Sequence, residues 1–146
     1  MGHSTFRLAA LLLVRKTRRD MCRTQLVQSC HTDEIIGQRQ EELDRQRSGL
    51  LDQCREAAAP GAVRLDRLIE YRHYDQHLTA QQDELAKQRQ DATLTINWHR
   101  KELLAANREV RILEKLEAKQ QDAYRERGER RETRMLDEMA VIQYAR

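Results

Sequence analysis

The residues whose chemistry could serve a site are few, and they are spaced as on the surface of a helix. His73 and His77 are four residues apart, so on a helix their imidazoles share one face and could together hold a zinc ion. No Cys lies near them in the sequence and no third ligand converges on the same face, although protein zinc sites need at least three protein ligands. We therefore predict surface histidines and no metal.

Cys22, Cys30 and Cys54 cannot all pair with one another within one chain, and nothing else in the sequence indicates an oxidising compartment. On a helix Cys22 and Cys30 are rotated by about 80° from each other, and His31 points away from both. We expect reduced, packed thiols in a cytosolic protein.

Motifs of enzymes are missing from the sequence, which contains neither a Gly-rich phosphate loop nor a G-x-S-x-G turn. A solvated coiled coil also has no enclosed pocket in which a side chain could be desolvated and its pKa tuned. The sequence therefore predicts a protein that is not an enzyme and that binds no cofactor.

The composition is that of long helices. Of the 146 residues, 39% are hydrophobic and 35% charged, and there are only one Pro and five Gly. Such a chain is too polar to close a globular core and is poor in turn formers. With 27 Lys and Arg against 24 Asp and Glu, the charges are nearly balanced, so no strong field draws the whole chain to nucleic acid or lipid.

One break divides the chain, because the only Pro, Pro60, is followed by Gly61. We predict an all-α fold in which the whole chain is one domain. Two long helices, at residues 5–58 and 62–144, are joined by a turn at 59–61, and the second helix is the longer.

Apolar residues recurring at seven predict the line along which the two helices pack, which we call the seam. In the first helix this line comprises Leu8, Leu12, Cys22, Leu26, Ile36, Leu43, Leu50, Cys54 and Ala57. In the second it comprises Tyr71, Leu78, Leu85, Ala92, Ile96, Leu103, Val110, Leu113 and Leu116. Arg15, Ser29 and several Gln interrupt it, and polar layers allow strands to part. We expect a monomeric antiparallel coiled-coil hairpin, with a parallel dimer as the alternative.

A turn near residue 60 places residue n beside roughly residue 120 minus n, so Phe6 and Leu8 should pack near Leu113 to Leu116. The last stretch of the second helix then has no partner strand. It is charged from Arg125 to Arg134 and afterwards exposes an apolar group, namely Met135, Leu136, Met139, Val141 and Ile142. Such exposed apolar surface predicts contact with another protein, and a frayed tail is the alternative.

Charged segments near both ends do not favour nucleic acid as a partner. The cluster from Arg15 to Arg23 is short, and the run from Arg125 to Arg134 is interleaved with Glu126, Glu129 and Glu132. The apolar run Leu8 to Val14 is far shorter than the ~20 residues that cross a bilayer.

Three blocks carry a resemblance to a known family, and they fall in its order and spacing. They are FRLAALL at residues 6–12, LEKLEAKQ at residues 113–120 and LDEMA at residues 136–140. In these blocks the chain resembles the FliJ family, the general chaperones and central stalks of flagellar type III protein export. That family is similar in turn to the two-helix coiled coil of the gamma subunit of rotary ATP synthases.

The resemblance implies that the paired ends of the chain enter the pore of the hexameric flagellar export ATPase. The residues implied in this docking are Phe6, Leu8, Leu113, Leu116, Met135, Leu136, Asp137, Glu138 and Met139. Carboxylates such as Asp137 and Glu138 oppose the helix dipole near a C-terminus, which suggests cationic partners in such a pore or else simple solvation.

At the hairpin end the resemblance implies contact with the cytoplasmic part of a FlhA-type export gate through Tyr74, Leu78, Gln81 and Leu85. Leu78 and Leu85 also belong to the predicted seam, so for these two the seam is an equal alternative. On the first helix this sequence departs from the family, since Glu42, Arg45 and Gly49 stand where others place apolar or aromatic residues.

As further partners the resemblance implies export chaperone–substrate complexes, which the protein would escort. It also implies a cytoplasmic location, peripheral to the inner membrane at the flagellar base and held there only through the export apparatus. The stalk of a virulence-type injectisome and a purely structural coiled-coil spacer are the alternative functions.

Overall fold

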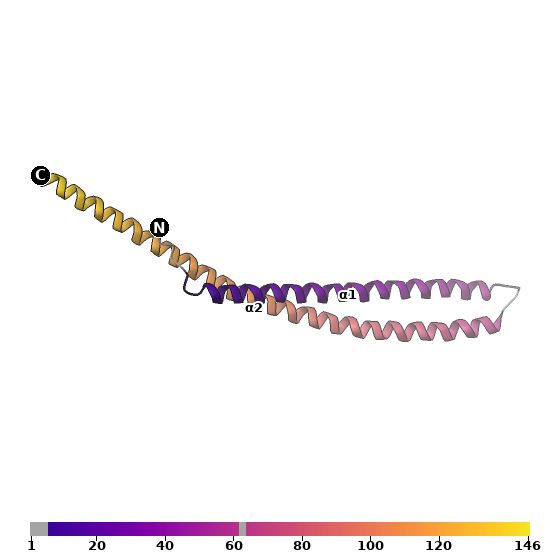
Figure 1. Ribbon diagram of the computed structural model, residues 1–146. Helices are drawn as coiled ribbons and strands as arrows, with labels where there is room; N and C mark the ends of the chain where they lie inside the picture. Colours follow the sequence, from indigo (N-terminus) through magenta and orange to yellow (C-terminus); the bar gives the residue numbers. More distant parts are fainter. Residues whose placement is uncertain (1–5, 62–63) are drawn as a thin grey trace. The chain divides into compact units, whose positions relative to one another are not determined.

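The computed structural model describes residues 6–61 and 64–146, which form two helices. Helix α1 spans Ala9–Ala57 and helix α2 spans Leu65–Tyr144. The two helices run in opposite directions and pack against each other as a hairpin (Figure 1). The predicted all-α hairpin with a longer second helix is confirmed.

The helix bounds differ from the predicted ones at the N-terminal end of each helix. Phe6 to Leu8 are not helical, and α1 begins where the backbone N–H of Ala9 donates to the carbonyl of Phe6 at 3.0 Å. The first turn of α1 contains no acidic residue that would favour an earlier start. The predicted starts at residues 5 and 62 lie outside the described residues.

The turn between the helices is built on Pro60 and Gly61, as their sequence predicts. Gly61 has φ = 123°, in the left-handed region that favours glycine, and Pro60 has no N–H to continue a helix. The N–H of Arg64 reaches back to the carbonyl of Ala57 at 3.4 Å. This bond joins the last residue of α1 to the residue that precedes α2.

The chain contains two compact units, each with its own part of both helices. The first unit comprises the N-terminal part of the chain up to Cys22 together with Glu102–Arg146, and the second comprises Arg23–Lys101. That the whole chain is one domain stays a prediction.

In the first unit the core is a cluster of Leu12, Val110 and Leu113, against which Phe6 packs. Leu12 lies beside Val110, which agrees with a register in which paired residue numbers add up to roughly 120. Leu8 and Leu116 are exposed instead of packed, so their predicted place in the seam is wrong. Leu8 precedes the helix, and the buried line of α2 continues from Leu113 through the half-buried Glu117.

In the second unit the core is formed by Leu43, Leu50 and Leu78, with Tyr71 and Leu85 packed against them. Leu43 is fully buried and Leu78 is only 2% exposed. These five residues are separated by seven within each helix, so the heptad prediction is confirmed here. The apolar seam is narrow, because most positions of both helices face solvent. Among the described residues, only apolar side chains are buried.

Candidate functional site

The C-terminal segment, which we define as residues 121–146, carries the largest group of exposed apolar side chains in the first unit. Every residue in it is exposed except the half-buried Gly128. Met135, Leu136, Met139, Val141 and Ile142 are each more than half exposed. Burying one side chain of this size against a partner stabilises a complex by roughly 1.5 to 3 kcal/mol. The segment therefore offers an apolar surface that no described part of its own chain covers.

The apolar side chains Met135, Met139 and Ile142 of this segment lie on nearly the same side of α2 as its buried positions. On α2 the buried positions Ala106, Val110 and Leu113 are spaced by four and three residues. On a straight helix this spacing drifts by about 20° every seven residues, so it no longer marks the direction of Val110 at the end of α2.

We call Met135, Met139 and Ile142 the C-terminal stripe, and at about 100° per residue all three lie within about 40° of the direction of Val110. The stripe thus continues the packed side of α2 beyond the residues that α1 covers.

The two acidic residues among the predicted docking residues, Asp137 and Glu138, lie at different angles to this stripe. Both Asp137 and Glu138 are exposed, and within the described residues neither forms an ion pair. Helical geometry places Glu138 about 60° from Met135 and Asp137 on the opposite side, about 160° away. Only Glu138 therefore borders the C-terminal stripe.

The other predicted docking residues lie in or near the core cluster of the first unit. Phe6 and Leu113 belong to the cluster around Leu12, whereas Leu8 and Leu116 are exposed near it, at 38% and 44%. The structure therefore brings Phe6 and Leu113 together inside the chain and leaves Leu8, Leu116 and the C-terminal stripe on the surface.

The basic residues near the N-terminus are paired with acids of α2. Arg15 donates to Glu109 at 3.0 Å, Arg18 lies 3.8 Å from Glu102, and Lys16 lies 3.7 Å from Glu114. Exposed pairs of this kind contribute only about 0 to 1 kcal/mol each, but together they fix the register of the first unit. They engage Arg15, Lys16 and Arg18 of the basic cluster with acidic side chains.

The predicted gate residues divide into two kinds. Tyr74 is 48% exposed, and Gln81 is half-buried with its amide nitrogen 3.0 Å from Nε2 of His77. Leu78 and Leu85 belong to the core of the second unit. For these two the seam role is confirmed, while a contact with the gate stays a prediction for all four.

A shallow groove of about 430 Å³ runs beside these positions and is lined by Arg39, Leu43, His77, Ala80, Gln81, Glu84 and Leu85. On α1, Glu42 lies 3.5 Å from Arg39 and accepts a hydrogen bond from Gln46. The acidic side chain of Glu42 is thus engaged within its own helix.

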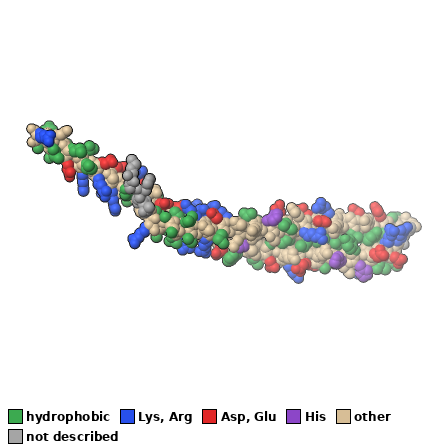
Figure 2. Space-filling model, in the orientation of Figure 1, with side chains coloured by type: hydrophobic (Ala, Val, Ile, Leu, Met, Phe, Trp, Pro, Cys, Tyr) green, Lys and Arg blue, Asp and Glu red, His purple; other side chains and the backbone are tan. Residues whose placement is uncertain are grey.

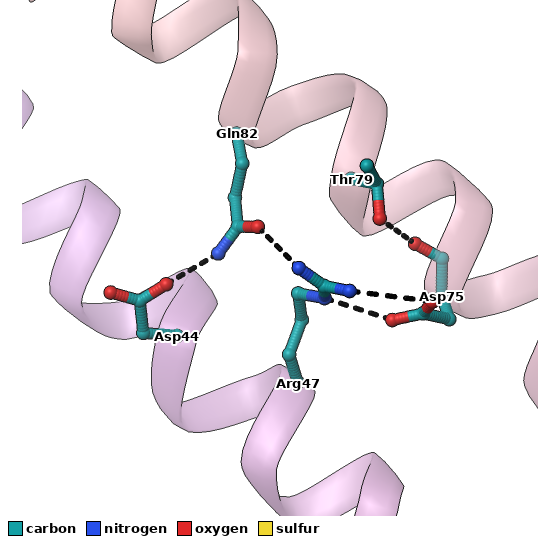
Figure 3. A network of polar contacts seen from close by, with 5 residues as sticks. All are labelled: Asp44, Arg47, Asp75, Thr79 and Gln82. Atoms are coloured by element: carbon teal, nitrogen blue, oxygen red, sulfur yellow. Dashed lines mark hydrogen bonds and ion pairs between the residues drawn. The ribbon is translucent and has the colours of Figure 1, made fainter.

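A polar network crosses the seam of the second unit, and sequence reasoning missed it (Figure 3). Arg47 donates through Nε to Oδ1 of Asp75 at 2.8 Å and through Nη1 to the Gln82 carbonyl at 2.8 Å. Gln82 in turn donates through Nε2 to Asp44, while Thr79 donates to the backbone carbonyl of Asp75. The hydrogen bond to Asp75, with the charges of the neighbouring carboxylates, raises the pKa of Arg47 above its ordinary value.

The numbers of Arg47 and Asp75 add up to nearly 120, and both residues stand where the heptad would place an apolar side chain. This coincidence was visible in the sequence as an opposite-charge pair across the predicted register. A second pairing of this kind joins Arg89, whose Nη1 donates to Gln40 at 2.7 Å and whose Nε lies 3.5 Å from Asp33.

Histidines and cysteines are distributed on the surface and in the seam. No group of three or more His, Cys, Asp or Glu side chains that could hold a metal is found in residues 6–61 and 64–146. All three cysteines are free, and the prediction of packed thiols holds for the buried Cys22 but is wrong for Cys30, which is exposed. On the face drawn in Figure 2, basic and acidic side chains are interspersed along both helices.

Neither helix contains, among the described residues, a stretch long and apolar enough to span a bilayer. Comparisons with curated proteins and with solved structures give no match. The family model described as "Flagellar FliJ protein" matches residues 4–146. This match spans nearly the whole chain, including both helices of the hairpin, and the chain therefore belongs to the FliJ family of flagellar proteins.

Proposed function

We propose that the chain is the central stalk of the flagellar export apparatus. Its C-terminal segment docks in the ring of the hexameric export ATPase, and the hairpin end contacts the cytoplasmic part of a FlhA-type gate. The protein also escorts export chaperone–substrate complexes. It works in the cytoplasm, at the inner membrane only through the apparatus. Membership of the FliJ family supports a role in flagellar export.

The observation that carries the proposal is the exposure of the C-terminal segment. An isolated helix with Met135, Met139 and Ile142 on its surface gains free energy by burying them in a partner. A ring of six similar subunits offers such an enclosure to a single rod. One rod inside six sites contacts them unequally, so its orientation biases which subunits hydrolyse ATP, and the rod carries that bias toward the gate.

Removal of residues 135–146 tests the docking. We expect the truncated chain to keep its helical circular-dichroism signal and its melting temperature, because the segment takes no part in either core cluster. Stimulation of the export ATPase should be lost. An unchanged stimulation would instead identify the chain as a structural spacer.

Point variants separate the C-terminal stripe from the rest of the segment. Met135→Gln, Met139→Gln and Ile142→Gln in one chain should abolish the stimulation. A matched control carries Arg130→Gln and Thr133→Gln on the other side of the same helix, where both residues are equally exposed. Equal losses in the two chains would contradict docking through the C-terminal stripe.

A further inference from the structure

The second unit has an exposed apolar pair on the side of α2 that faces away from α1. Leu94 is 68% exposed and Trp98, one helical turn later, is 57% exposed. The Trp98 ring stacks edge-to-face with that of His99, with ring centroids 4.9 Å apart. Because this contact orients the ring, the indole face is held at the surface at little further entropic cost.

The residues around this pair repeat the spacing of a helix seam. Lys87, Asp91, Leu94, Trp98 and Lys101, which we call the outer stripe, are separated by four, three, four and three residues. This spacing places side chains on one face of a helix. The buried Ile96 of the inner seam lies about 160° around the helix from both Leu94 and Trp98. The outer stripe is therefore a second packing face that α1 leaves open.

The charges of the outer stripe restrict what can pack on it. Asp91 and Lys101 are both exposed, and within residues 6–61 and 64–146 neither forms an ion pair. A uniformly acidic partner would be repelled by Asp91, and a uniformly basic one by Lys87 and Lys101. A complementary helix must present a base, two apolar residues and an acid at the same spacing in the reverse order.

The chain itself presents that order. We propose that the outer stripe is a self-association site that binds the outer stripe of a second copy in antiparallel orientation. Under a two-fold axis passing beside Ile96, Asp91 of each copy faces Lys101 of the other, and Leu94 faces Trp98. The same patch serves both copies, as an isologous interface requires.

The contact is short, so the dimer is weak and reversible. The outer stripe covers about four helical turns, and only two large apolar side chains on each copy lie in it. Stable dimers bury on the order of 1,200 to 2,000 Å² in total, which this patch does not reach. Self-association thus responds to the local concentration of the chain, as when several copies gather at one place.

Sedimentation of the full chain at rising concentration, with the fluorescence of Trp98 followed in parallel, tests the proposal. We expect a monomer–dimer equilibrium and a blue shift of the emission as dimer forms, because Trp98 is the only tryptophan. Trp98→Ala should remove the dimer. A chain that stays monomeric throughout, or a dimer that survives Trp98→Ala, would overturn the proposal.

Charge reversal identifies the partner and its orientation. Asp91→Lys places lysine against lysine, and Lys101→Asp places two aspartates together, so each variant alone should dimerise roughly tenfold more weakly. When the two variants are mixed, both ion pairs return, one between the unchanged Asp91 and Lys101 and one with its charges exchanged, and a heterodimer should form with nearly the original affinity.

Arg100→Asp, which reverses a neighbouring charge off the outer stripe, is the matched control and should leave the dimer unchanged. Failure of the mixed variants to associate would exclude the antiparallel arrangement. Loss of the dimer in Arg100→Asp would point to net charge instead of the outer stripe.

Discussion

Tyr74 and Leu78 are one helical turn apart on α2 and have opposite surroundings. Tyr74 is 48% exposed, whereas Leu78 is 2% exposed and packs with Leu43 and Leu50. Because of this difference in burial, substitution of Tyr74 tests binding of a partner, and substitution of Leu78 tests packing of the seam.

Tyr74→Ala should weaken capture of the cytoplasmic part of the export gate and leave the melting temperature almost unchanged, because an exposed phenol contributes little to folding. Leu78→Ala should destabilise the hairpin by about 2 to 5 kcal/mol, the usual cost of removing a buried leucine. Pull-down with the gate fragment and thermal denaturation distinguish the two effects. If Tyr74→Ala binds the gate as the natural chain does, Tyr74 is not a gate contact.

Arg47 is the other residue whose role depends on its exact neighbours. Its guanidinium holds Asp75 and Gln82 across the seam while remaining partly open to solvent. Arg47→Ala and Asp75→Ala should each lower the melting temperature less than Leu78→Ala does. In a double-mutant cycle their coupling should shrink as salt is added, since screened pairs lose most of their attraction. A coupling that is independent of salt would mean that packing, and not charge, joins these residues.

At the scale of the helices, the effect of replacing a glycine depends both on the low helix propensity of glycine and on the space available for a Cβ. Gly49 has open space where a Cβ would stand, whereas at Gly37 a Cβ would lie 3.4 Å from the guanidinium of Arg89. Gly61, in the turn, has a positive φ that a residue with a side chain rarely adopts.

Gly49→Ala should therefore stabilise the chain by roughly 0.5 to 1 kcal/mol, the gain for alanine over glycine inside a helix. Gly37→Ala should gain less, because Arg89 must shift away from Asp33 and Gln40. Gly61→Ala should lower stability. Chemical denaturation of the three variants gives the order, and a Gly37 variant as stable as the Gly49 variant would show that Arg89 moves freely.

The helices themselves could be predicted from the sequence because their signals are local. A single Pro–Gly pair marks the turn, and a heptad of leucines marks the face that is buried around Leu43 and Leu78. The pairings of Arg47 and Arg89 are harder to predict, because their only sequence signal is a polar or opposite-charge pair across the register, which is not local. Each polar residue in the heptad looks like a defect until the register and rotamers of both helices bring its partner within reach. Roles that depend on another protein, such as those assigned to Tyr74 or Glu138, are not encoded in the packing of this chain at all.

For the molecule as a whole, the contrast between the paired helices and the C-terminal segment predicts unequal resistance to proteolysis. Arginine side chains from Arg125 to Arg134 are exposed on a helix without tertiary cover. Limited digestion with trypsin should cut there first and release the peptide that bears the C-terminal stripe, because uncovered helix opens locally at little cost. Mass spectrometry of the early fragments identifies the sites.

The export ATPase should protect these same arginines if the segment docks in its ring. First cleavage within residues 64–120 would contradict the difference in local stability. Cleavage at Arg125 to Arg134 that is equally fast with the ATPase present would contradict the docking.

The direction in which Met135 and Met139 point, close to that of Val110, depends on the number of helical residues between them. Adding a single residue to the uncovered helix would swing the methionines by about 100° and lift them by only about 1.5 Å. Adding seven residues would lengthen the helix by about 10 Å and leave the methionine side chains pointing in almost their original direction. Insertions in this part of α2 thus change the direction of the methionine side chains and the length of the helix separately. If the C-terminal stripe must meet its binding site at a set angle, a seven-residue insertion should be tolerated better than a one-residue insertion.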